Sequence, residues 1–155
     1  IMVRAYAYVR SMGGEGLKHA TEMAVLNANY VRARLEGVYD LPYKNRSLHE
    51  VIFSDKDLEG VCHTLDVAKR LIDYGYHPPT IYFPLVVKGA IMIEPTETES
   101  MEILDEFCDA MLAIAEEAKN EPELLHSAPQ LTRIKRLDET TAARQPCLCW
   151  LPEDE

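Results

Sequence analysis

The chain has 155 residues, of which 47% are hydrophobic, and it carries a formal net charge of −10 at pH 7. This length suits one domain that buries roughly two-thirds of its unfolded surface. The acidic balance argues against a general binder of nucleic acid or of anionic membranes, because phosphate groups attract clustered Lys and Arg.

Two helices are predicted at the start of the chain. The first spans residues 3–12 and is ended by Gly13 and Gly14. The second spans residues 15–36, where apolar residues recur near helical spacing, and Gly37 stops it. A polar loop then leads to a buried strand at residues 50–54.

A third helix is predicted at residues 61–74. Gly75 stands where a left-handed residue would end it, and Pro78 and Pro79 prevent continuation. Two short strands follow at residues 80–83 and 90–94.

The last long helix is predicted to run to about residue 119. Thr96 and Glu99 have the spacing of a capping box at its start. Residues 121–155 are polar and interrupted by proline, which predicts an extended tail. This order of elements predicts an α+β fold, with helices packed on one face of a short mixed or antiparallel sheet.

Four sequence pieces, in a fixed order, point to one known family. They are Met12-Gly-Gly-Glu-Gly-Leu17, Leu26-Asn-Ala-Asn-Tyr30, Asp66-Val-Ala-Lys-Arg-Leu71, and the stretch from Asp73 to Ser100 that contains His-Pro-Pro-Thr and Glu-Pro-Thr-Glu-Thr-Glu-Ser. Together they resemble the carboxy-terminal part of glycine dehydrogenase (decarboxylating) subunit 2, the P-protein of the glycine cleavage system. The resemblance runs from about residue 6 to residue 117.

The resemblance implies a fold and an activity. It implies the small C-terminal domain of an aminotransferase-like (fold type I) enzyme that depends on pyridoxal 5'-phosphate (PLP). Residues 1–36 would link to a large domain, residues 37–120 would form the small domain, and residues 121–155 the tail. The family decarboxylates glycine on PLP and passes the aminomethyl group to the lipoyl group of H-protein. The implied partners are subunit 1, lipoylated H-protein and glycine.

The lysine that binds PLP in this family follows a histidine, and none of the seven lysines here does so. The resemblance therefore implies that the Schiff-base lysine lies outside this chain, so we expect no catalytic residue in it and no activity from it alone. Two other hypotheses remain open, namely a stand-alone amino-acid-binding regulatory module and a dimerisation domain.

Two histidines are candidates for contact with the substrate. His49 precedes the first strand beside Glu50, where the pair could orient a substrate or relay a proton. Alternatively, His49 is hydrogen-bonded to nearby backbone at the strand end. His77 lies on the rigid turn before Pro78, which could present it to a ligand or let it cap the preceding helix.

The other candidates are Thr80, Glu94 and Glu97. Thr80 begins a strand and could line a cleft, although threonine is common in strands. The capping box accounts for Thr96 and Glu99, which leaves Glu94 and Glu97 for acid–base work in a cleft. The turn at residues 12–16 could bind an anion through its amides or serve only as a hinge.

The remaining features restrict cofactors and location. Cys147-Leu-Cys149 lacks the two-residue gap of structural zinc sites, so we predict no metal. The sequence has no apolar stretch long enough to cross a membrane, and its start lacks the pattern of a secretory signal. We therefore expect a cytoplasmic protein.

Arg46, Arg70 and Arg144 are available to bind a carboxylate, and the sequence does not choose among them.

Overall fold

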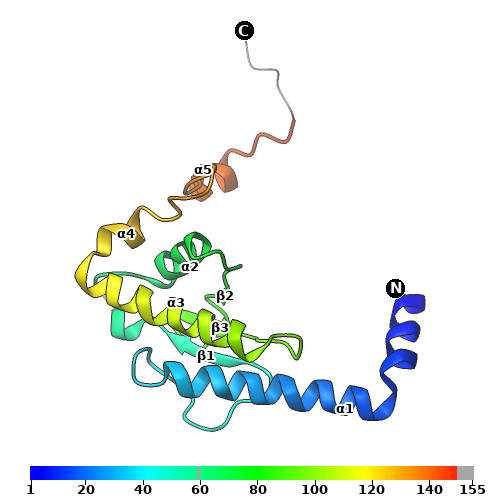
Figure 1. Cartoon of the computed structure of the whole chain (residues 1–155). Helices are drawn as coiled ribbons and strands as arrows, with labels where there is room; N and C mark the ends of the chain where they lie inside the picture. The colour runs from blue at the N-terminus through cyan, green and yellow to red at the C-terminus, as the bar shows by residue number, and fades with distance from the viewer. Residues whose placement is uncertain (59, 150–155) are drawn as a thin grey trace.

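The computed structural model describes residues 1–58 and 60–149. Three strands in this part of the chain form one antiparallel sheet with the order β1–β3–β2, and helices lie around it (Figure 1). The elements in chain order are α1 (Met2–Leu35), β1 (Val51–Ser54), the 3-10 helix η1 (Lys56–Leu58), α2 (Thr64–Asp73), β2 (Thr80–Ile81), β3 (Ala90–Ile93), α3 (Met101–Asn120), α4 (Pro122–His126) and α5 (Glu139–Arg144).

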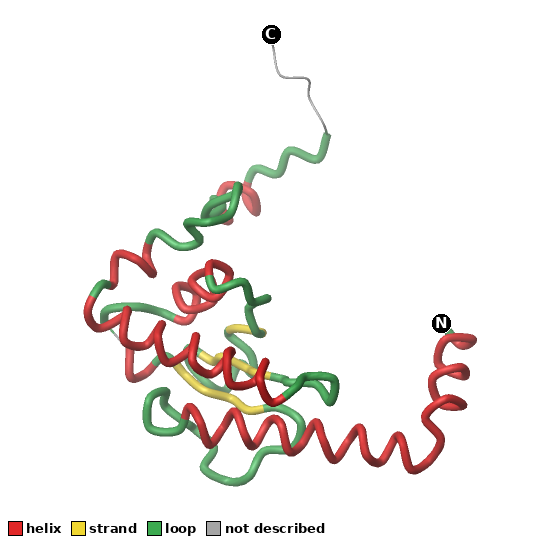
Figure 2. Tube along the Cα trace, viewed as in Figure 1, coloured by secondary structure: helices red, strands yellow, loops and turns green. Residues whose placement is uncertain are grey.

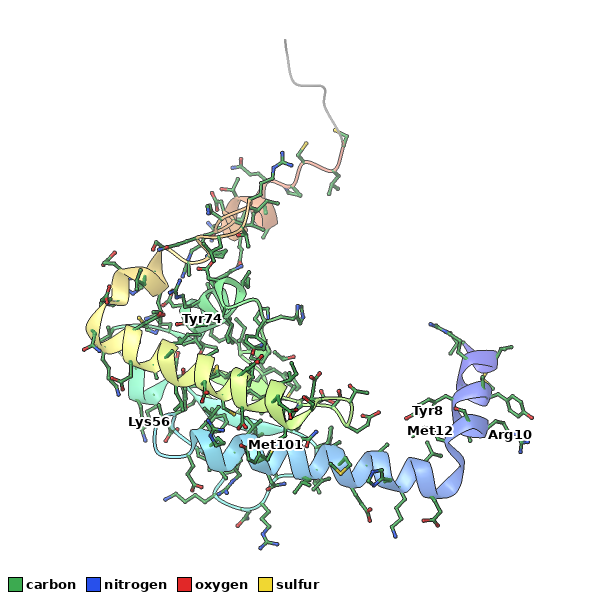
Figure 3. All side chains as sticks on the ribbon, viewed as in Figure 1. Tyr8, Arg10, Met12, Lys56, Tyr74 and Met101 are labelled. Carbon is green, nitrogen blue, oxygen red and sulfur yellow. The ribbon has the colours of Figure 1, made fainter. Side chains whose placement is uncertain are left out.

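The two leading helices are continuous except for a kink at Gly13. This residue has φ 62° and ψ −177°, a non-helical conformation that glycine adopts at little cost. In Figure 1 the chain bends here, so the first turns of α1 stand away from the sheet. Figure 3 shows Tyr8, Arg10 and Met12 on this arm, apart from the rest of the molecule. The predicted break after residue 12 is therefore confirmed.

The core lies between the sheet and the helices. Val51 pairs with Ile93 and Phe53 pairs with Ile91, and all four side chains are buried in one cluster. Figure 2 shows the strands beside α3, which contributes buried apolar side chains such as Met111 to the same cluster. Since partners in an antiparallel ladder share a face, the alternation of these residues fixes the register of β1 on β3.

The end of α2 follows the prediction from its sequence. Gly75 has φ 87°, and its amide donates to the carbonyl of Ile72, while the amide of Tyr76 donates to the carbonyl of Leu71. This pair of bonds is the Schellman motif, which satisfies two carbonyls that the helix leaves free. The chain therefore leaves α2 in a fixed direction at His77.

Two local predictions are wrong. The strand predicted at residues 80–83 ends at Ile81, because Tyr82 takes a left-handed conformation with φ 59° that turns the chain. The capping box is also wrong, since α3 begins at Met101 and its N-cap is Ser100, whose hydroxyl accepts from the amide of Ile103. The Thr96 hydroxyl instead lies 2.7 Å from that of Thr98.

A pair of alanine substitutions tests this corrected helix start. Ser100→Ala is expected to lower the free energy of unfolding by about 1 kcal/mol, the usual cost of losing an N-cap side chain. Thr96→Ala is expected to change it by less than about 0.5 kcal/mol, as exposed substitutions generally do. Urea titration of both variants measures the difference. A larger loss of unfolding free energy from Thr96→Ala than from Ser100→Ala would instead support the capping box.

The segment predicted as an extended tail contains the short helices α4 and α5, and its first part returns to the body of the domain. The short helix α4 packs against α2 and α3, and α5 follows further along the chain (Figure 1). The last six residues of the predicted tail, 150–155, lie outside the described residues. None of the described helices is long and apolar enough to cross a membrane.

Candidate functional site

A cavity of about 390 Å³ lies between the end of α2, the sheet and the first turns of α3. One wall is apolar and includes Tyr76 and Phe107, whose rings meet edge to face with centroids 5.4 Å apart. Ile103 and Leu104 continue this wall along α3. Aromatic pairs in this geometry hold each other in place, so this wall is preformed.

The polar side of the cavity holds three of the predicted site residues. His77 and Thr80 reach it from the segment that the Schellman motif directs out of α2, and Glu94 reaches it from the end of β3. Thr80 pairs with Met92 across the β2–β3 ladder. This pairing places Thr80 next to the last residues of β3, which Glu94 directly follows. The sheet register therefore brings together residues that are far apart in the sequence.

His49 joins this group through Glu94. Its Nε2 lies 3.7 Å from Oε1 of Glu94, and both side chains are 55% exposed. At this exposure water screens the attraction between them, so the contact adds little to stability. An imidazole nitrogen and a carboxylate oxygen can each accept or donate a proton, so the pair offers acid–base chemistry beside the cavity.

Glu97 is not among the residues that line the cavity, and its role stays a prediction. Glu99 does line it, although the capping box had seemed to explain that residue. The apolar wall was also missed, because Phe107 and Ile103 have the spacing of ordinary core residues on a helix. Tyr76, the aromatic residue directly before the His-Pro-Pro turn, was the available signal.

Comparison with known proteins identifies the family of the chain. The family model for the glycine dehydrogenase C-terminal domain matches residues 20–130. The chain belongs to this family. It is 56% identical over 156 residues to a protein of Exiguobacterium sibiricum, a match that covers 100% of the chain and 32% of that relative. It is 59% identical over 149 residues to a protein of Shouchella clausii, covering 96% of the chain and 30% of the relative.

A protein of Caldanaerobacter subterraneus is 54% identical over 151 residues, covering 97% of the chain and 31% of the relative. All three relatives are named probable glycine dehydrogenase (decarboxylating) subunit 2. The chain therefore spans about a third of the length of the curated relatives that it matches. The resemblance seen in the four sequence pieces is confirmed.

The cavity of this glycine dehydrogenase domain does not fit PLP as a complete site. PLP binding requires a lysine for the Schiff base, and its phosphate favours cationic donors. Neither a lysine nor an arginine is among the described residues that line the cavity. Of the three candidate arginines, Arg70 is held by Glu117 through bonds of 2.8 and 2.9 Å, and hydrogen bonding to Glu117 raises the pKa of its guanidinium.

A second cluster lies near the start of α2, whereas the cavity lies beyond its end. Cys62, Asp66 and His126 place one potential metal ligand each within 4.8 Å of one another. The two oxygens of Asp66 already accept from Arg136, at 2.7 Å, and from the amide of His63, at 2.8 Å. Burial raises the pKa of the Cys62 thiol, which opposes the thiolate that a metal needs. This cluster therefore holds the chain after α4 in place.

Proposed function

We propose that this domain forms one wall of the substrate cleft in a P-protein that decarboxylates glycine. The observation that carries the proposal is the meeting of His77, Thr80 and Glu94 at one apolar-walled cavity, with His49 beside Glu94. Membership of the glycine dehydrogenase C-terminal domain family supports it. Within fold type I enzymes this would be the small domain, which closes over the substrate.

The cofactor in this proposal is PLP, and it is held by the part of the enzyme outside this chain. The absence of lysine and arginine from the described cavity lining supports that division. The enzyme would release carbon dioxide from glycine and pass the aminomethyl group to the lipoyl group of H-protein. The chain alone is then inactive.

The polar residues have separate tasks in this cleft. His77 and Thr80 offer hydrogen-bond donors, which suit the carboxylate of glycine. The pair of His49 and Glu94 can hold a proton at Nε2 of His49, beside the substrate. Tyr76 stays neutral, because burial raises the pKa of its phenol, so the aromatic wall adds no competing charge.

The assembly in this proposal contains subunit 1 and lipoylated H-protein, and it works in the cytoplasm. Large apolar side chains on the first turns of α1 support a contact with another part of the enzyme. Those with the greatest exposure are Ile1, Met2, Val3 and Tyr6.

The test is glycine–carbon dioxide exchange by the full-length protein with subunit 1, H-protein and PLP. Glu94→Gln and His49→Ala are each expected to lower kcat/KM for glycine about 100-fold, the usual size of a lost acid–base group. Glu102→Gln, on the exposed side of α3, is the matched control and is expected to leave exchange within twofold. Wild-type rates in both site variants would show that the cleft lies elsewhere.

A further inference from the structure

Two asparagines on α1 make side-chain contacts with two different loops. Asn27 is buried, with 6% of its surface exposed, and its Nδ2 donates to the carbonyl of Thr96 at 2.9 Å. Asn29 contacts Ser47 twice, since Nδ2 donates to the Ser47 carbonyl at 2.7 Å and Oδ1 accepts from the Ser47 amide at 3.0 Å. The motif that contains both residues belongs to the family resemblance and has no role in the site described above.

The placement of these contacts follows the candidate site. Ser47 lies two residues before His49, and Thr96 lies two residues after Glu94. The side chains of His49 and Glu94 lie 3.7 Å apart, and Glu94 lines the cavity. Each asparagine therefore holds the backbone next to one member of the pair.

Asparagine is chemically suited to this task. Its amide both donates and accepts, so one side chain can satisfy the amide and the carbonyl of a single residue, as Asn29 does for Ser47. Aspartate would lose the donor and leucine would lose both. Asparagine is a poor helix former, so helix propensity does not explain two of them within three residues of α1.

The part of α1 that carries the asparagines is firmly attached to the body of the domain. Val31 and Leu35 are buried in the core. Tyr30 and Arg34 both contact Asp105 of α3, and Arg34 also contacts Asp109 at 2.6 Å. These attachments make α1 a fixed base from which the two loops are held.

We propose that Asn27 and Asn29 are positioning residues that hold His49 and Glu94 together at the cavity. The inference rests on the proposed function for the consequence in catalysis, whereas the loop attachment itself does not depend on it. Two measurements therefore separate the attachment from its effect on the reaction.

The first measurement is amide hydrogen exchange in the full-length protein. Asn29→Ala is expected to speed exchange of the Ser47 amide at least tenfold, since that amide loses its acceptor. Asn27→Ala is expected to speed exchange within residues 94–100. The control is Tyr30→Phe, which removes a contact between α1 and α3 and leaves both loop contacts in place. Unchanged exchange in both asparagine variants would overturn the inference, whatever the function.

The second measurement is glycine–carbon dioxide exchange in the assembled enzyme. Asn27→Ala and Asn29→Ala are each expected to lower kcat about tenfold while KM for glycine changes less than threefold, because misplaced groups slow the reaction more than they weaken binding. In a His49→Ala background, Asn29→Ala is expected to have no further effect, since both changes remove the same group. Tyr30→Phe is expected to stay within twofold of wild type.

The outcomes distinguish the two levels of the argument. Faster loop exchange with wild-type kcat, in an enzyme that His49→Ala does slow, overturns the positioning role alone. Additive effects of His49→Ala and Asn29→Ala do the same, because Asn29 would then act elsewhere. Full activity in His49→Ala contradicts the proposed function and the inference together, and faster loop exchange would then report a purely structural attachment.

Discussion

Gly89→Ala is expected to lower the free energy of unfolding by about 3–5 kcal/mol, one of the largest effects available in this chain. An added Cβ would lie 1.7 Å from Oδ1 of Asp55, and Gly89 has φ 64°, where a side chain is strained. Asp55 has little freedom to move away, because Thr64 holds it with two hydrogen bonds. Oδ2 of Asp55 accepts from the backbone amide of Thr64 at 3.0 Å and from the Thr64 hydroxyl at 2.9 Å. The substitution must therefore strain the backbone and break hydrogen bonds to a charged group.

Gly37→Ala separates these two costs. Gly37 has φ 89°, yet among the described residues no atom beyond its two chain neighbours lies within 4 Å of the position of its added Cβ, so only the backbone strain applies. Gly37→Ala is expected to lower the free energy of unfolding by about 1–2 kcal/mol. Thermal and urea unfolding of the two variants measure the difference, which is the cost of displacing Asp55. Equal losses at the two positions would show that Asp55 moves aside freely.

Local sequence signals predicted the features that depend on a few neighbouring residues. The break at Gly13 and the end of α2 at Gly75 both follow from the freedom of glycine at positive φ. The buried strand β1 follows from its run of Val51, Ile52 and Phe53, which fits a buried sheet better than an exposed loop. These patterns were sufficient to predict an α+β fold with a short sheet, but they left open whether the sheet is mixed or, as observed, antiparallel.

Predictions failed where two local signals competed. Thr96 and Glu99 matched a capping box, but Ser100 is also a good N-cap and α3 begins there. The early end of β2 before Tyr82 was not predicted, because a left-handed tyrosine is rare and has no sequence signature. Such choices are decided by packing, which the sequence pattern does not contain.

The candidate site combined both kinds of result. His77, Thr80 and Glu94 were identified by their place between short elements, and the cavity does gather them. The contact between Glu94 and His49 and the attachment of Ser47 through Asn29 join residues far apart in the chain, so no local spacing predicts them. Polar residues on a helix facing the core were the missed signal, because a buried amide requires partners.

Asp73→Asn is expected to release the segment that follows α4 from the end of α2. The Asp73 side chain is 1% exposed, and its carboxylate accepts from the amides of Gln130 and Leu131 at 2.7 and 2.8 Å and from Arg70 at 3.3 Å. The asparagine side chain would place its NH2 donors against the backbone amides and the guanidinium that now donate to Asp73. We therefore expect the free energy of unfolding to fall by about 2–3 kcal/mol. Amide exchange of Gln130 and Leu131 measures the release, and Asp138→Asn, at the exposed N-cap of α5, is the control.

The same carboxylate gives stability a defined pH dependence. Burial alone raises the pKa of Asp73, but the bonds from Leu131, Gln130 and Arg70 outweigh it and hold the pKa below the ordinary value of 3.8. Because the folded pKa is the lower one, the stabilisation is complete above pH about 4–5 and is lost as pH falls through the folded pKa. Asp73→Asn removes the group that titrates, so the variant should lack this part of the fall in the free energy of unfolding at acid pH. The curves of unfolding free energy against pH for variant and wild type should therefore converge toward acid pH. Parallel curves down to pH about 2 would contradict a charged Asp73 in the folded protein.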